Sequence, residues 1–119
     1  MIIWEGVTMY LTEPAVDASV RAVSALSAPG STLVFTYVTP VALARTGLLQ
    51  RLVRRLVAGR GEPLRFGFVP EELRAWLAER GLALALDTSF SPLAKNLLPQ
   101  RYHPWFDDET NRIAIARVI

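Results

Sequence analysis

The chain has 119 residues, of which 51% are hydrophobic and 20% are charged, and its formal net charge is +2. This balance is typical of one globular domain, and the absence of cysteine excludes disulfides, thiolate metal ligands and a cysteine nucleophile. No apolar run reaches the roughly eighteen residues that a membrane span needs, and residues 1–5 lack the basic start of a signal peptide. We therefore expect a cytoplasmic protein.

The first third of the sequence predicts a strand, a helix and a second strand. Residues 2–4 are a short apolar run that indicates a buried strand. A helix is expected from Thr12, its N-cap, to about Ser27, because valines recur at helical spacing and a Pro-Gly pair follows. Residues 31–38 are β-branched, aromatic and nearly all apolar, which predicts a strand buried on both faces.

The remainder predicts two more helices, two more strands and one long connection. A helix is expected from Pro40 to just before Gly59, with an apolar stripe and a face of four arginines opposite it. The later expected elements are a loop at 61–68, a helix from 70 to a Gly81 cap, a strand at 82–86, a connection at 89–111 that is helical near 92–98, and a strand at 113–119. This alternation predicts an α/β fold, with the first two strands parallel and adjacent.

Residues 4–11 read Trp-Glu-Gly-Val-Thr-Met-Tyr-Leu and resemble the segment after the fourth sheet strand in the leucine carboxyl methyltransferase family. This family includes bacterial members linked to polyketide O-methylation. Residues 33–38 are similar to the family's fifth strand, and residues 65–77 are similar to its later helix and the lead-in to that helix.

The resemblance implies the C-terminal half of a Rossmann-like, S-adenosylmethionine-dependent methyltransferase of class I. The expected sheet holds the family's fourth, fifth, seventh and sixth strands side by side, as two parallel strands and a C-terminal antiparallel pair flanked by helices. No glycine-rich turn follows a predicted strand, so the family's cofactor-binding motif is absent. We expect residues 1–119 to be one partial methyltransferase domain that lacks the N-terminal cofactor-binding half.

The same resemblance assigns candidate site residues. It implies that Glu5 and Gly6 bind the methionine part of S-adenosylmethionine, and that Tyr10 is a catalytic residue whose hydroxyl orients a substrate carboxylate. Thr36 stands where bacterial relatives often have an acid. The implied reaction is O- or carboxyl-methylation of a small molecule or carboxylate. Because methyl transfer depends mainly on alignment of donor and acceptor, we expect the chain alone to be inactive.

Simpler interpretations stay open for each of these residues and motifs. Glu5 alone could be a solvated acid at a strand end, and Tyr10 could be a packing residue. The arginine-rich helix suits a helix lying on a sheet better than a nucleic-acid or membrane surface, so neither partner is expected. The single histidine, His103, stands near three acids in a segment better explained as a turn than as a metal site, and no metal is expected.

The second hypothesis for function is a non-catalytic interaction module. Residues 2–4 would form an exposed apolar edge of the sheet, and uncovered edges recruit partners. The expected partner is a second copy, in a homodimer that pairs these edges, or else the absent N-terminal half. A weaker alternative is a basic protein that binds anionic surfaces.

Overall fold

The computed structural model describes residues 1–42, 44, 64–105 and 109–119. Its elements follow the predicted order. They are β1 (Ile2–Trp4), the 3-10 helix η1 (Thr8–Tyr10), α1 (Glu13–Leu26), β2 (Thr32–Val38), α3 (Pro70–Ala78), β3 (Leu82–Ser89), α4 (Phe90–Leu97), the 3-10 helix η2 (Gln100–Trp105) and β4 (Asn111–Val118). The predicted helix of residues 40–59 lies almost entirely outside the described residues, together with its arginine face.

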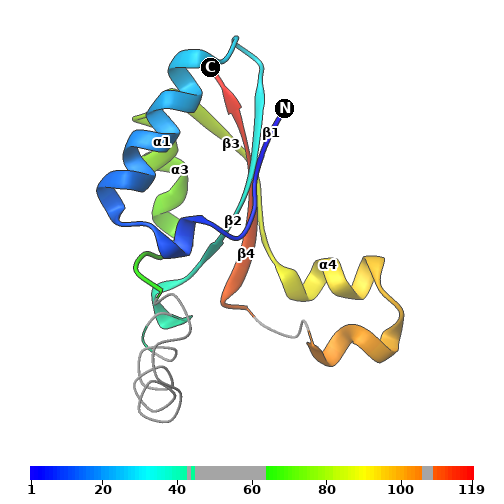
Figure 1. Ribbon diagram of the computed structural model, residues 1–119. Coiled ribbons are helices and arrows are strands. Elements are labelled where there is room, and N and C mark those ends of the chain that lie inside the picture. The colour runs from blue at the N-terminus through cyan, green and yellow to red at the C-terminus, as the bar shows by residue number, and fades with distance from the viewer. Residues whose placement is uncertain (43, 45–63, 106–108) are drawn as a thin grey trace.

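The strands form one sheet in the order β1-β2-β4-β3 (Figure 1). β1 pairs with β2 in parallel, and β4 is antiparallel to both of its neighbours. The α1 crossover between β1 and β2 brings the first two strands together, as the alternation of elements predicted. The α/β class and the half-sheet expected from the sequence, with its C-terminal strand inserted between two others, are therefore confirmed.

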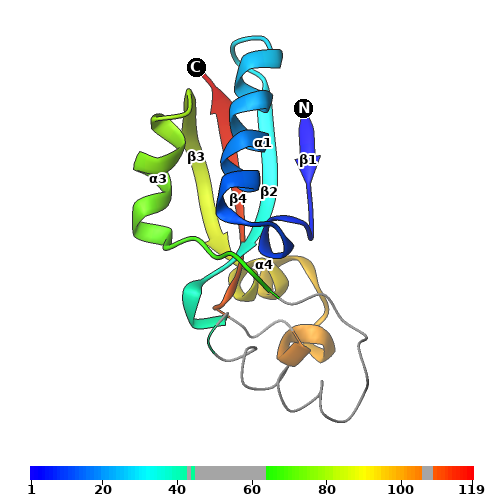
Figure 2. The ribbon, with the colours of Figure 1, turned by 60° about the vertical axis from the view of Figure 1, so that its left-hand side comes forward.

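One face of the sheet is covered by α1 and α3 (Figures 1 and 2). Val16 of α1 and Leu73 of α3 are completely buried against this face. Alternate residues of the strands point toward these helices, because successive side chains of a strand point to opposite faces. The main core cluster contains Val16, Val20, Leu33, Phe35, Tyr37, Phe68, Leu73, Leu77, Leu82, Ala114, Ala116 and Val118. Burial of each large aliphatic or aromatic member contributes about 1.5–3 kcal/mol to the free energy of folding.

The opposite face of the sheet has little cover among the described elements. Only α4 lies beside it, at the end where β3 stops (Figure 1). Val34, Ile113 and Ile115 of this face are half-buried, and 65% of Ile3 is exposed. The strong apolar character of residues 33–38 predicted a strand buried on both faces, but the described part of the chain buries only one face fully.

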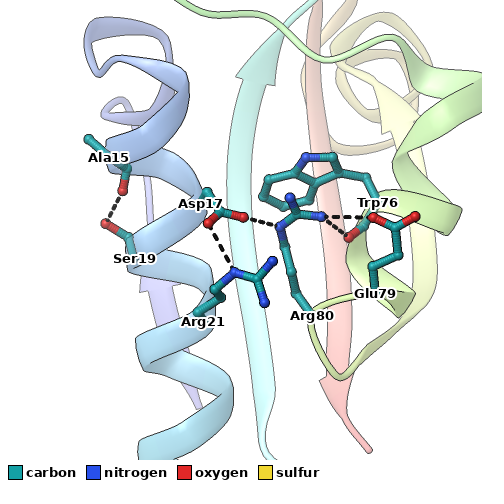
Figure 3. A network of polar contacts seen from close by, with 7 residues as sticks. All are labelled: Ala15, Asp17, Ser19, Arg21, Trp76, Glu79 and Arg80. Carbon is teal, nitrogen blue, oxygen red and sulfur yellow. Dashed lines mark hydrogen bonds and ion pairs between the residues drawn. The ribbon is translucent and has the colours of Figure 1, made fainter.

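A polar network joins α1 to the end of α3 above the core (Figure 3). Asp17 accepts hydrogen bonds from Arg21 at 2.9 Å and from Arg80 at 2.5 Å. Arg80 also donates to the carbonyl of Trp76 at 2.7 Å, and its guanidinium carbon lies 3.6 Å from the centre of the Trp76 ring. Since Arg80 contacts both helices, this network fixes how α1 and α3 lie relative to each other.

The ends of the helices agree with the expected capping residues. Thr12 precedes α1 in an extended conformation, with Glu13 and a proline in the first turn, although its side chain makes no capping hydrogen bond. Gly30 and Gly81 adopt positive φ angles of 85° and 79° after α1 and α3, where other residues would be strained. None of the helices in the described part of the chain has the length and hydropathy that spanning a bilayer requires.

Candidate functional site

β1, β2 and β3 run in the same direction, because β1 is parallel to β2 and β4 is antiparallel to both β2 and β3. Their carboxyl ends therefore lie at the same end of the sheet. In open α/β sheets, ligands bind outside the carboxyl ends of the strands. The residues that follow the strands at this edge are Glu5 after β1, Thr39 after β2 and Phe90 after β3. The candidate site is therefore built from the Glu5 segment and its neighbours on β2 and α4.

The Glu5–Gly6 turn is held against the neighbouring strand. Gly6 has a φ of 67°, in the left-handed region that favours glycine. Its amide donates a 2.8 Å hydrogen bond to the side-chain hydroxyl of Thr36 on β2. The hydroxyl of Thr8, which is buried, donates at 2.8 Å to the carbonyl oxygen of Thr36. One residue of β2 thus fixes the connection between β1 and η1 at two points.

A hollow of about 240 Å³ opens beside this turn. Apolar residues of β1, β2, β4 and the start of α4 line it, together with Glu5 and Thr36. The residues that line it are Ile3, Glu5, Val34, Phe35, Thr36, Phe90 and Ile113. A carboxylate and an aromatic ring beside apolar walls suit a ligand that carries a positive charge on an apolar body.

The predicted site residues are only partly brought together. Glu5 lines the hollow, whereas Gly6 follows it in the sequence and is not among the lining residues, and both lie at the surface. Tyr10 ends η1, with 40% of its surface exposed, and its amide donates to the carbonyl oxygen of Val7 at 3.0 Å. Tyr10 is not among the residues that line the hollow. Its assignment as a catalytic residue stays a prediction.

A second polar cluster at this end of the sheet was not foreseen from the sequence. The Tyr37 hydroxyl donates to Asp87 at 2.8 Å, and Arg112 donates through Nε to Tyr37 at 3.0 Å and to Asp87 at 3.1 Å. Burial raises the pKa of Tyr37, and the hydrogen bond to Asp87 raises it further. Burial by itself would lower the pKa of Arg112, but the bonds to Asp87 and Tyr37 raise it overall. We call these three residues the Tyr37 cluster.

Asp87 reaches this cluster because of a β-bulge. Leu84 pairs with Ala116 and Asp87 pairs with Ala114, and the register shifts between Leu84 and Leu86. Strict alternation would place Leu86 on the helix-covered face, whereas the bulge leaves 45% of Leu86 exposed. The predicted strand of residues 82–86 ends immediately before Asp87, so the local sequence pattern does not indicate the cluster.

The Tyr37 cluster borders a wider groove of about 550 Å³ at the same edge of the sheet. Arg112 lines this groove together with Glu71 and Glu109, between the residues that follow β2 and those that begin α3. The groove thus combines one guanidinium with two carboxylates. It lies on the helix-covered side, whereas the Glu5 hollow opens on the other face.

The described residues include no group of three His, Asp or Glu side chains that could hold a metal ion. The Nε2 atom of His103 lies 2.8 Å from the carbonyl oxygen of Leu98, within the turn that connects α4 to η2. Asp107 and Asp108, two of the acids near His103 in the sequence, lie outside the described residues.

Comparison with known proteins gives matches of structure and none of sequence. No protein-family model matches the chain, and no curated protein matches it. Magnesium protoporphyrin IX methyltransferase (ChlM) from Synechocystis PCC 6803, solved with bound SAH, matches 98% of the chain with a TM-score of 0.54 and 13% identity. The small RNA methyltransferase HEN1 matches 98% with a TM-score of 0.55 and 16% identity, and PKMT2 from Rickettsia typhi matches 98% with a TM-score of 0.58 and 11% identity.

The chain has part of a methyltransferase-like fold. It spans 43% of the Synechocystis protein, 34% of the Rickettsia protein and 13% of HEN1, which is less than half of each. At these identities the likeness concerns the fold alone. The predicted assignment to a methyltransferase-like sheet is confirmed at this level, while the leucine carboxyl methyltransferase family remains an expectation from residues 4–11.

Proposed function

We propose that this chain is the substrate-side part of an S-adenosylmethionine-dependent methyltransferase that methylates an oxygen or carboxylate of a small molecule. The observation that carries the proposal is the Glu5–Gly6 turn, which is fixed to Thr36 beside an apolar hollow at the carboxyl end of a parallel strand. The methyltransferase fold of three solved structures supports the same reading.

S-adenosylmethionine suits the donor set at this hollow. Its methionine part carries an ammonium and a sulfonium, and Glu5 offers a carboxylate beside apolar walls. The cofactor would supply the methyl group, and the role of Glu5 would be to orient the donor. Tyr10 would orient a carboxylate of the acceptor through its hydroxyl. We propose that the chain by itself transfers no methyl group, because alignment of donor and acceptor supplies about 7–11 kcal/mol and needs an enclosed pocket.

Isothermal titration calorimetry with S-adenosylhomocysteine, the cofactor product, tests the proposal. We expect saturable binding to the wild-type chain, weakened at least about tenfold by Glu5→Ala and unchanged by Glu79→Ala, whose carboxylate is 73% exposed on α3's far end. Tyr10→Phe should leave this binding unchanged, because Tyr10 is assigned to the acceptor. Absence of binding by the wild-type chain, or equal binding by Glu5→Ala, would contradict the proposal.

A second candidate function is a homodimerisation module, and the position of β1 favours it. β1 forms one edge of the sheet, and no other strand in the described part of the chain pairs with its outer side. Two β1 strands could pair antiparallel about a two-fold axis, and the apolar face that begins at Ile3 would be continuous with the new interface.

The oligomeric state at micromolar concentration tests this candidate by light scattering after size-exclusion chromatography. A dimer that is lost in Ile3→Arg and kept in Leu26→Arg would support it, since Leu26 is also exposed (88%) but lies on α1. A monomeric wild-type chain would rule it out.

A further inference from the structure

Thr36 makes two separate attachments to the segment that follows β1. Its side-chain hydroxyl accepts a hydrogen bond from the Gly6 amide, and its backbone carbonyl accepts one from the Thr8 hydroxyl, each at 2.8 Å. Thr8 is 1% exposed, so the second bond is shielded from water. We call this pair of hydrogen bonds the Thr36 clasp. The clasp links β2 to the segment that follows β1, and its two hydrogen bonds are additional to the backbone pairing between these parallel strands.

The Thr36 clasp restrains the conformation of the turn that carries Glu5. Gly6 has a φ of 67°, in the region that favours glycine, and a Cβ built on it would meet no atom within 4 Å. The Gly6 amide is held by its hydrogen bond to the Thr36 hydroxyl. Because Glu5 immediately precedes this amide, its range of motion is limited by the same bond.

Thr36 also shares the hollow with Glu5. Both residues line it, together with apolar residues, and Glu5 is the only charged one among the described residues that do. A carboxylate in place of the Thr36 hydroxyl could still accept the amide hydrogen bond, but it would add a second negative charge beside Glu5. The hydroxyl thus fixes the turn and keeps the hollow at one negative charge.

We propose that Thr36 is a positioning residue, which holds the Glu5 carboxylate at the hollow for the ammonium group of a ligand. This inference rests on the proposed function, since the ligand meant is the methionine part of the cofactor. It explains why a threonine can stand where an acid was expected from the family resemblance. Thr36 itself acts through Gly6 and Glu5 and has no part in the chemical step.

The test uses Thr36→Val, which keeps the β-branched shape but cannot accept the Gly6 hydrogen bond. Thr36→Ser restores a hydroxyl, and Thr32→Val is the matched control, since Thr32 lies on the same strand and face at its other end. The two readouts are the hydrogen-exchange rate of the Gly6 amide by NMR and the affinity for S-adenosylhomocysteine by calorimetry. Circular dichroism checks that each variant is folded.

We expect Thr36→Val to speed exchange of the Gly6 amide at least about tenfold and to weaken S-adenosylhomocysteine binding about fivefold. Thr36→Ser should recover most of both effects, and Thr32→Val should show neither. Unchanged exchange at Gly6 in Thr36→Val would overturn the clasp. Faster exchange with unchanged affinity would overturn its positioning role. Absence of binding by the wild-type chain would overturn the proposed function and the ligand assignment, while the exchange rate would still decide whether Thr36 holds the turn.

Discussion

Asp87 of β3 and Arg112 of β4 form a 3.1 Å ion pair on the helix-covered face of the sheet, with side chains only 13% and 19% exposed. They meet because the register shift between Leu84 and Leu86 turns Asp87 toward the helices. The Tyr37 hydroxyl bonds to both. A polar group at this depth is tolerated only while all of its members are paired.

Replacing one partner of this ion pair should therefore lower the free energy of unfolding more than replacing both partners. We expect Asp87→Leu to lower the free energy of unfolding by about 2–3 kcal/mol, because Arg112 keeps its charge without a carboxylate. The double variant Asp87→Leu with Arg112→Met should be less destabilised than Asp87→Leu alone. Urea unfolding measures both, with Glu79→Ala as the surface control. A double variant that costs the sum of the two single changes would show that the two charges are not coupled.

Among the glycines with positive φ, Gly81 should be the one whose replacement by alanine lowers stability most. A Cβ at Gly81 would lie 2.6 Å from the Ser24 hydroxyl oxygen, whereas a Cβ at Gly30 would contact nothing within 4 Å. Gly30→Ala should cost about 1–2 kcal/mol, from backbone strain alone. Gly81→Ala should cost more, and adding Ser24→Ala should remove the excess but leave the backbone part. If Ser24→Ala recovers nothing, the cost at Gly81 is conformational only. Thermal or urea unfolding of these variants supplies the comparison.

Arg80 should not be replaceable by lysine. Its guanidinium lies on the Trp76 ring and bonds at the same time to Asp17 and to the Trp76 carbonyl, and only 11% of the side chain is exposed. A lysine ammonium cannot provide the flat surface and the second donor together. We expect Arg80→Lys to cost about 1 kcal/mol of unfolding free energy. Arg21→Lys, at a 56% exposed position of the same network, should cost about 0.3 kcal/mol or less. Equal costs would mean that the Trp76 contact contributes nothing.

Asp17 should make stability depend on pH on the acid side. Its hydrogen bonds with Arg21 and then with Arg80 hold the pKa of its carboxyl below the usual value of 3.8. A carboxyl whose pKa is lowered on folding stabilises the native state above the unfolded-state pKa, and this contribution disappears as the pH falls through the folded-state pKa. Asp17→Asn should therefore lower the melting temperature at about pH 6 and have a smaller effect at about pH 2. A constant difference across this range would contradict the expected linkage.

The order of the elements along the chain could be predicted because its signals are local. The valines of α1 recur at helical spacing, and residues 33–38 form a continuous apolar run. Each of these elements can therefore be recognised from a short stretch of sequence. Placement of residues 113–119 between two other strands came from the resemblance to a family, because pairing between distant strands is not visible in a local pattern.

The candidate site was predictable only in part. Glu5 and Gly6 stand in a stretch whose resemblance to a family could be read directly. The role of Thr36 depends on a contact across 30 residues of sequence, and the Tyr37 cluster depends on contacts across 25 to 75 residues. The end of β3 was missed because Asp87, Thr88 and Ser89 are polar, and polar residues after an apolar run normally indicate a loop.

The central place of β4 has a consequence for how the sheet assembles. β4 follows all the other described strands in sequence, yet among them it is the only one that pairs with β3, and it joins β3 to β2 along its whole length. Until β4 is in place, β2 and β3 belong to two separate βα pieces, each with an open edge. Closing the gap between them requires contacts between residues about 80 positions apart, such as Leu33 with Ala116, which favours slow folding. We therefore expect insertion of β4 to be the step that joins the two pieces into one sheet.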